Sequence, residues 1–233
     1  MALRARYGAE AAMRPANSSA ARGAAVAARP GRGRRAQATV AALAFAAALL
    51  SACSSQPPAP DWALDAKGAL DRATTAWLEG RSRVEAQEFA RGLEALSRTG
   101  RVELIARAEL LRCAVRVASL AFDDCGGFER LRTDAPAAER AYADYLAGRS
   151  VADTALLPPA QQAVAGARGA TADAALAAIA HPLSRLVAAA VLLRRGDATP
   201  ASLQTAVDTA SAQGWRRPLL AWLGVQALRA EQA

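Results

Sequence analysis

Histidine is nearly absent from this sequence, because His181 is the only one among 233 residues. A single histidine excludes the H-E-x-x-H motif of zinc peptidases, and with the few cysteines present it does not complete a tetrahedral zinc site. P-loops, G-x-G-x-x-G turns after a strand and G-x-S-x-G nucleophile elbows are also missing. The sequence therefore predicts no metal, no cofactor and no catalytic residue, and we expect His181 to lie at a helix start.

Among residue types that commonly act in catalysis, aspartate and glutamate are plentiful, whereas histidine and cysteine are few. Paired acids could serve a cofactor-independent glycan enzyme that acts on the cell wall. Most of them, however, stand among arginines at helical spacing, as Glu103 does with Arg107 and Glu109 with Arg112. Ion pairs on solvated helix faces explain this spacing better. We therefore expect a non-enzymatic protein and keep the glycan enzyme as the alternative.

The net positive charge is small over most of the chain, although the net charge of the whole chain is +8. Residues 1–52 contain eight arginines and one acid, so they carry +7. The remaining 181 residues carry only about +1, from 21 basic and 20 acidic groups. A nucleic-acid-binding domain needs its positive field in the folded part. The distribution therefore excludes nucleic acid as the expected partner.

Alternating runs of β-branched and aromatic residues are missing too, and aromatic residues make up only 5% of the chain. Apolar periodicity, punctuated by glycine and proline, instead predicts helices. The expected helices cover 61–79, 82–98, 102–120, 136–147, 160–166, 171–180 and 182–195, with two more from Pro200 to Gly214 and from Pro218 onward. Helix 102–120 is apolar nearly all round and should be central. Ser82 with Glu85, and Ser150 with Asp153, predict capping boxes.

Short turns between these helices imply antiparallel hairpins, so the expected fold class is all-α. Residues 77–82 (WLEGRS) are similar to residues 145–150 (YLAGRS), at twice the 34-residue tetratricopeptide period. This weak resemblance favours a tetratricopeptide-like stack. An irregular helix bundle is the alternative.

The N-terminal segment has the layout of an export signal. A basic stretch that ends at Arg35 precedes thirteen uncharged residues, 38–50, which are too few to span a bilayer. Leu50, Ser51, Ala52 and Cys53 follow directly. This tetrad resembles the lipobox of bacterial lipoproteins. The resemblance implies that signal peptidase II recognises Leu50, Ser51 and Ala52, that it cuts before Cys53, and that lipid anchors Cys53 in a membrane.

The same resemblance implies a location. Ser54, rather than aspartate, follows the cysteine, which favours the outer membrane with the domain facing the periplasm. Residues 53–60 contain three prolines and form a linker that holds the domain about 20–25 Å off the lipid. The expected organisation is a signal peptide over 1–52, this linker, and one helical domain over 61–233.

Two cysteines remain if Cys53 carries lipid. Outside the cytoplasm disulfides persist. Cys113 lies on the central helix and Cys125 lies beyond its end, so five residues must double back about 10 Å along the helix, which Gly126 and Gly127 would permit. We predict a Cys113–Cys125 disulfide, with two free thiols as the alternative.

Arginine and tryptophan gather near the C-terminus. This region offers a possible interaction patch made of Arg194, Arg195, Trp215, Arg216, Arg217 and Trp222, unless Trp222 lies in the core. Stacked helical hairpins commonly bind peptides. The leading functional hypothesis is therefore a membrane-anchored, non-catalytic scaffold or adaptor for another envelope protein.

Overall fold

The structure is a computed structural model that describes residues 59–232. The predicted signal peptide, with Leu50, Ser51, Ala52 and Cys53, lies outside the described residues, as does most of the linker. Between residues 59 and 232 the chain forms helices and no strand, which confirms the all-α prediction. No helix in this range has the length and apolar character needed to cross a membrane. The helices are α2 (Asp61–Leu78), α3 (Ser82–Ser97), α4 (Val102–Ala118), α5 (Gly126–Glu129), α6 (Ala137–Leu146), the 3-10 helix η1 (Thr154–Leu156), α7 (Pro159–Ala165), α8 (Gly169–Ala178), α9 (Pro182–Arg194), α10 (Pro200–Ala212) and α11 (Arg216–Glu231).

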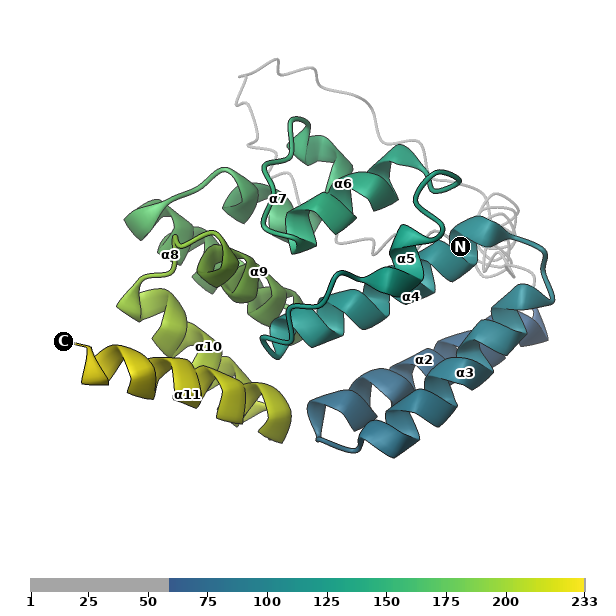
Figure 1. Cartoon of the computed structure of the whole chain (residues 1–233), viewed down its shortest axis with the longest axis horizontal. Helices are drawn as coiled ribbons and strands as arrows, with labels where there is room; N and C mark the ends of the chain where they lie inside the picture. Colours follow the sequence, from purple (N-terminus) through teal and green to yellow (C-terminus); the bar gives the residue numbers. More distant parts are fainter. Residues whose placement is uncertain (1–58, 233) are drawn as a thin grey trace, which may run out of the picture. The chain divides into compact units, whose positions relative to one another are not determined.

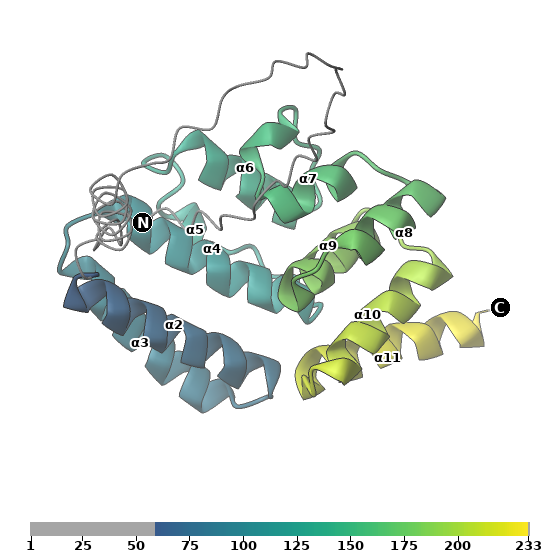
Figure 2. The ribbon, with the colours of Figure 1, turned by 180° about the vertical axis from the view of Figure 1, so that it is seen from behind.

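Helices α2 and α3 form an antiparallel hairpin, seen from both sides in Figures 1 and 2. The buried side of α2 consists largely of alanines at helical spacing, namely Ala63, Ala66, Ala69, Ala73 and Ala76. Small side chains let the two helix backbones approach closely. Gly92 on α3 extends this contact, because a Cβ atom there would lie 2.9 Å from Cδ2 of Leu70.

Helix α4 lies at the centre of the fold, as its sequence predicts. It contacts α2 and α3 on one side, and α5, α6 and α9 on the other (Figure 1). Buried positions occur around most of its circumference, from Leu104 and Ala106 to Val117 and Ala118. The larger core cluster joins α4 to α6–α11, and a smaller one joins its first turns to α2 and α3.

Glycine and proline place most helix ends correctly. Gly80, Gly196 and Gly214 follow helices with positive φ, a conformation that lets the chain leave the helix without a Cβ clash. Most helix ends fall within two residues of the prediction, and two features differ more clearly. Helix α5 was not expected, and α11 begins at Arg216 rather than at Pro218, because proline is tolerated throughout the first helical turn, where backbone N–H groups have no intrahelical partner.

Both predicted capping boxes are wrong. Ser82 lies inside α3, and its hydroxyl accepts a hydrogen bond from Arg217 instead of capping the helix. Asp153 caps the short helix η1, because its side chain accepts a hydrogen bond from the backbone N–H of Ala155. Ser150 forms no part of this cap. The motif at 199–202 shows what a box requires: Thr199 and Ser202 each bond the other's backbone N–H.

The repeated sequence at 77–82 and 145–150 is a shared way of ending a helix. In both copies the glycine, Gly80 or Gly148, has a positive φ. The following arginine N–H bonds a carbonyl five residues earlier, Arg81 to Ala76 and Arg149 to Asp144. Beyond this point the copies differ, since α3 begins at once after the first copy and an irregular segment follows the second. The similarity therefore reflects local capping and defines no repeat.

Three glutamates are buried, and arginines neutralise each of them. Glu85 is 4% exposed. Its carboxylate accepts hydrogen bonds from Nε of Arg112 at 2.7 Å and from Nη2 at 3.2 Å. Glu88 pairs with Arg72 and Arg91, and Glu139 with Arg107. On α3 the alanines Ala86 and Ala90 are therefore exposed, while Glu85 is buried. A bidentate guanidinium makes such burial tolerable.

Replacement of Glu85 by alanine should lower the free energy of unfolding by about 3 kcal/mol, because Arg112 loses its partner in a partly desolvated site. Chemical denaturation of the purified protein measures this change. The control is Glu94→Ala, which removes an exposed ion pair with Arg98 and should cost less than about 0.5 kcal/mol. Equal losses in the two variants would contradict this role of Glu85.

A candidate binding site around the disulfide

The loop after α4 is fixed at both ends. Helix α4 ends at Ala118, and Leu120 turns the chain back with a φ of 57°. The backbone N–H of Ala121 bonds the carbonyl of Arg116 at 3.0 Å. At the far end Cys125 forms the predicted disulfide with Cys113, with the two Cα atoms 5.4 Å apart. The returning segment is therefore anchored along the side of α4.

Asp123 gives this loop its internal order. Its carboxylate accepts the backbone N–H of Cys125 at 3.1 Å and a guanidinium N–H of Arg116 at 2.9 Å. Cys125 has a φ of 49°, unusual for a residue other than glycine, and it precedes the short helix α5. Phe128 of α5 is fully buried and secures the exit of the loop. The loop is thus held by a covalent bond, a salt bridge and a core side chain.

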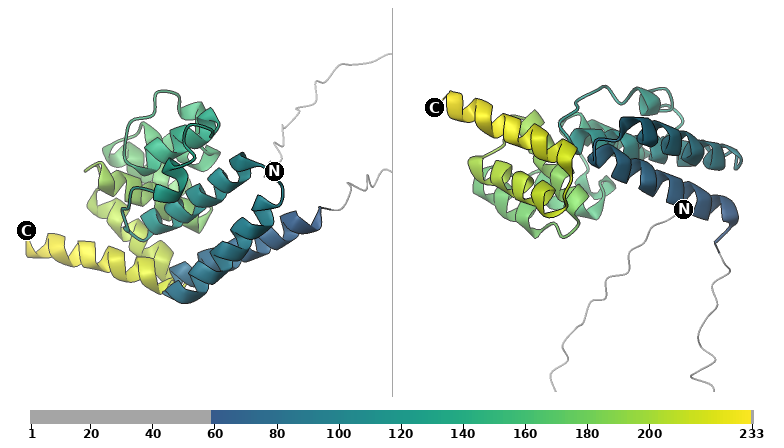
Figure 3. Two further views of the ribbon diagram at one scale, coloured as in Figure 1. Left: turned by 45° about the vertical axis from the view of Figure 1, so that its right-hand side comes forward. Right: turned by 90° about the horizontal axis from the view of Figure 1, so that it is seen from below.

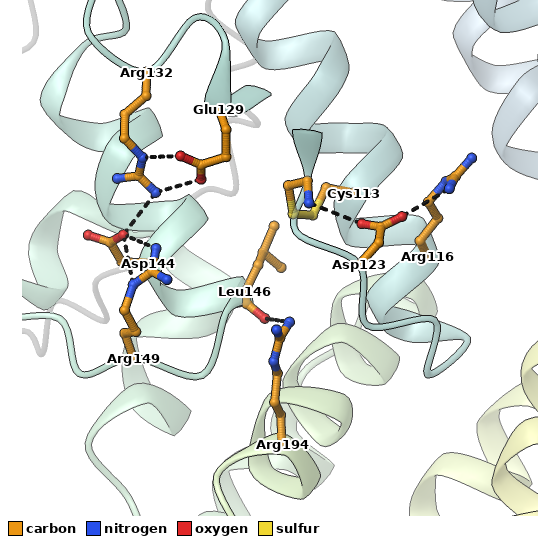
Figure 4. Close-up of a disulfide and its surroundings, with 10 residues drawn as sticks. Cys113, Arg116, Asp123, Glu129, Arg132, Asp144, Leu146, Arg149 and Arg194 are labelled. Atoms are coloured by element: carbon orange, nitrogen blue, oxygen red, sulfur yellow. Dashed lines mark hydrogen bonds and ion pairs between the residues drawn. A yellow bond between two sulfur atoms is a disulfide. The ribbon is translucent and has the colours of Figure 1, made fainter. Parts of the chain in front are cut away.

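A polar hollow of about 200 Å³ lies beside this loop and is here called the loop hollow. Its lining comes from the loop, α5, α6 and the end of α9, with the charged side chains Asp123, Asp124, Glu129, Arg132, Arg149 and Arg194. Figure 4 shows Asp123, Glu129, Arg132, Arg149 and Arg194 of this lining, together with Asp144 of α6. Glu129, Arg132, Asp144 and Arg149 form a continuous chain of ion pairs. Arg194 lies apart and donates to the carbonyl of Leu146 at 3.2 Å.

The acids of this chain are held in the ionised form. The hydrogen bond from Arg132 lowers the pKa of Glu129. Burial acts to raise the pKa of Asp144, but hydrogen bonds from Arg149 and Arg132 outweigh it, so the net pKa is lowered. Ionised, paired carboxylates do not donate protons at neutral pH. Glu129 and Asp144 therefore stabilise the fold at any pH above their pKa in the unfolded chain. This stabilisation is lost as the pH falls through their lowered pKa in the folded protein.

A second hollow of about 110 Å³ adjoins the disulfide and is here called the disulfide hollow. Asp123 and Cys125 line both hollows. Glu109 of α4 lines the second, and its carboxylate lies so close to Gly127 that a Cβ atom there would collide with it. Burial raises the pKa of Glu109, although Arg112, Arg130 and Arg116 act in the opposite direction. Glu109 is thus the one acid in the described part of the chain whose resolved pKa shift favours the protonated form.

A larger hollow, of about 320 Å³, lies between α2 and α3. Its arginines, Arg72, Arg91 and Arg98, have side chains that are 60–67% exposed. Arg72 and Arg91 are used by the buried Glu88, and Arg98 pairs with the exposed Glu94. The loop hollow is the better candidate because covalent and core contacts set its shape.

The six residues of the predicted C-terminal patch do not form one surface. Trp222 is fully buried and donates to the carbonyl of Ala118, so its placement on the surface was wrong. Arg195 donates to the carbonyl of Ala165, and Arg217 to that of Trp77. Trp215 is partly buried against the core, and Arg216 is exposed. Only Arg194 of this set reaches the loop hollow.

Comparison with known families, with curated proteins and with solved structures gives no match. Function is therefore inferred from the geometry of the chain itself.

Sequence reasoning found part of this site. The cysteine pair and the Asp-Asp-Cys-Gly-Gly turn are local features and indicate a constrained loop. Asp144 and Arg149 were missed, because only the fold brings Arg132, which follows α5, to Asp144 of α6 (Figure 4). Among the described residues, the group most similar to a metal site is Cys113, Asp123 and Cys125. In the disulfide form these cysteines offer no thiolate ligand.

Replacing both Cys113 and Cys125 by serine should lower the free energy of unfolding by about 3 kcal/mol, because the crosslink closes a short loop. Chemical denaturation without reductant measures the loss. As a check, reductant should destabilise the wild-type protein by a similar amount and leave the double variant unchanged. An identical mass of the alkylated protein with and without prior reduction would refute the disulfide.

Proposed function

We propose that this protein is a lipid-anchored, non-catalytic helical adaptor that binds another protein of the bacterial envelope through the loop hollow. The lipobox-like tetrad that ends at Cys53 supports the anchor, and the prolines of residues 53–60 support a spacer. Lipid on Cys53 places the helical domain at the periplasmic face of the outer membrane. Two or three acyl chains hold a protein stably where one does not.

The loop of residues 119–125 is the observation that carries the adaptor role. Phe122 at its tip is 39% exposed, although aromatic side chains of this size are usually covered. The guanidinium of Arg194 lies 5.1 Å from the centre of its ring and holds the ring in place. Asp124 stands beside it, exposed and without an ion pair in the described part of the chain. Phenylalanine and arginine are both enriched at the core of protein–protein interfaces.

The chemistry of the loop hollow favours binding over catalysis. Glu129 and Asp144 are paired with arginines, and the lowered pKa of each disfavours a role as general acid. The loop hollow contains both acidic and basic side chains, so a partner surface that carries both positive and negative charges would be complementary to it.

One observation favours the alternative, a glycan enzyme. Glu109 has a raised pKa and shares the disulfide hollow with the ion-paired Asp123. Glycoside hydrolysis uses a pair of carboxyl groups, and a raised pKa suits the one that acts as general acid. The small volume of this hollow and the bond of Asp123 to a backbone N–H weigh against it.

Replacement of Cys53 by serine should move the protein from the membrane fraction to the soluble fraction and abolish its labelling by a fatty-acid analogue. The sulfur is the only attachment point for diacylglycerol, so no other residue can substitute for it. Fractionation of cells that express the full-length chain measures both effects. A serine variant that stays in the membrane fraction would disprove the anchor.

Crosslinking of the native protein in its own membranes should recover an envelope protein in a fixed ratio, and Phe122→Ala should reduce that recovery by about tenfold. The matched control is Val102→Ala, since Val102 is 40% exposed and lies at the start of α4, outside the loop hollow. Quantitative mass spectrometry of the crosslinked material gives the ratio.

The outcomes of this experiment separate the two functions. Equal recovery by wild type, Phe122→Ala and Val102→Ala would remove the loop hollow from the binding site. Enrichment of cell-wall fragments without a protein partner, abolished by Glu109→Gln, would favour the enzyme.

A further inference from the structure

The outer side of α11 carries a stripe of exposed residues that the domain leaves uncovered. The α11 stripe consists of Arg216, Leu220, Leu223, Gly224, Ala227 and Glu231, which recur at helical spacing and are all exposed. Leu220 is 70% exposed, the highest value among the large apolar residues described. Figure 3 shows α11 at the edge of the domain, where it contacts α10 and α2 through its other side.

The stripe is self-complementary. If two copies of α11 pack antiparallel about a two-fold axis between residues 223 and 224, Arg216 of one copy faces Glu231 of the other. In the same register Leu220 faces Ala227, and Leu223 faces Gly224. Neither Arg216 nor Glu231 forms an ion pair with another residue in the 59–232 range. Opposite charges at both ends and apolar residues between them fit the symmetry of a two-fold interface.

Gly224 gives an independent indication. Glycine inside a helix is destabilising relative to alanine, and within the domain nothing requires it, because a Cβ atom there would meet no atom within 4 Å. A glycine opposite Leu223 of a second helix has a clear use, since it provides space for the leucine side chain. A lipid surface would be served better by a large apolar residue at this position.

We infer that the protein forms a homodimer through the α11 stripe, with the two helices antiparallel. One helix pair of this length, about 24 Å, buries less surface than standard stable interfaces. The dimer is therefore weak in solution, with a dissociation constant of about micromolar. The inference does not depend on the adaptor role, because it uses neither the lipid anchor nor the loop hollow.

A charge exchange tests both the partner and its direction. Two full-length copies with different tags are coexpressed, and the amount of one that copurifies with the other is measured. Arg216→Glu alone and Glu231→Arg alone should each reduce self-association by about tenfold, since each places like charges together. The two variants mixed with one another should pair as well as wild type, because every facing pair is then opposite in charge. The chain that carries both exchanges should also self-associate normally.

Two further variants separate association from folding. Gly224→Leu should raise the thermal midpoint of unfolding through better helix propensity, yet weaken the dimer because the added side chain collides with Leu223 of the second copy. Leu220→Ser should weaken the dimer, while Leu64→Ser, at a residue 56% exposed on α2, should not.

Three results would overturn the inference. The first is a wild-type chain that sediments as a monomer at about 100 µM, well above the expected dissociation constant. The second is failure of the mixed charge variants to associate although both are folded. The third is tighter membrane binding by Gly224→Leu together with no copurification of the two differently tagged wild-type copies, which would identify the stripe as a lipid-binding surface.

Discussion

The free carbonyl groups at helix C-termini set the architecture of this domain. An α-helix leaves its last four carbonyls without intrahelical partners, and buried carbonyls need donors. Here the donors come from the side chains of later helices. Arg194 donates to the last residue of α6, Arg195 to the last residue of α7, and Arg185 to Ile179 at the end of α8. From α11, Trp222 donates to the last residue of α4 and Arg217 to the end of α2.

These contacts explain how short helices hold together with few large apolar side chains. Helices α9 and α11 supply the donors, so they secure the ends of five other helices at once. A guanidinium suits this task because it remains charged, offers several N–H groups in one plane and interacts favourably with the negative end of a helix dipole. Arg217 shows the combination: it bonds a carbonyl and the Ser82 hydroxyl while lying 4.0 Å from the centre of the Trp77 ring.

The same interactions explain which features the sequence could and could not predict. Helix limits follow from local chemistry, so Gly80, Pro182 and Gly196 place them within a residue or two. The disulfide is local as well, with a sequence separation of twelve between its cysteines. Arg217 and Trp77, by contrast, are 140 residues apart in the chain. Nothing near Arg217 distinguishes it from Arg216, so a sequence pattern groups both into one patch. In the fold Arg217 bonds Trp77 and Ser82, whereas Arg216 is exposed.

This difference has a consequence for the charged surface. Arginine accounts for almost all the positive charge of the domain, yet many of its guanidinium groups bond backbone carbonyls or buried acids such as Glu85 and Glu88. A guanidinium group bonded in this way is fixed in orientation, and its charge is partly neutralised by the group that it bonds. The near-neutral charge of residues 53–233 and the internal use of arginine are the two reasons for which we expect a partner other than nucleic acid. The polar groups still available for recognition are those placed outside the capping network, such as Asp124 beside the disulfide loop and Arg216 and Glu231 on α11.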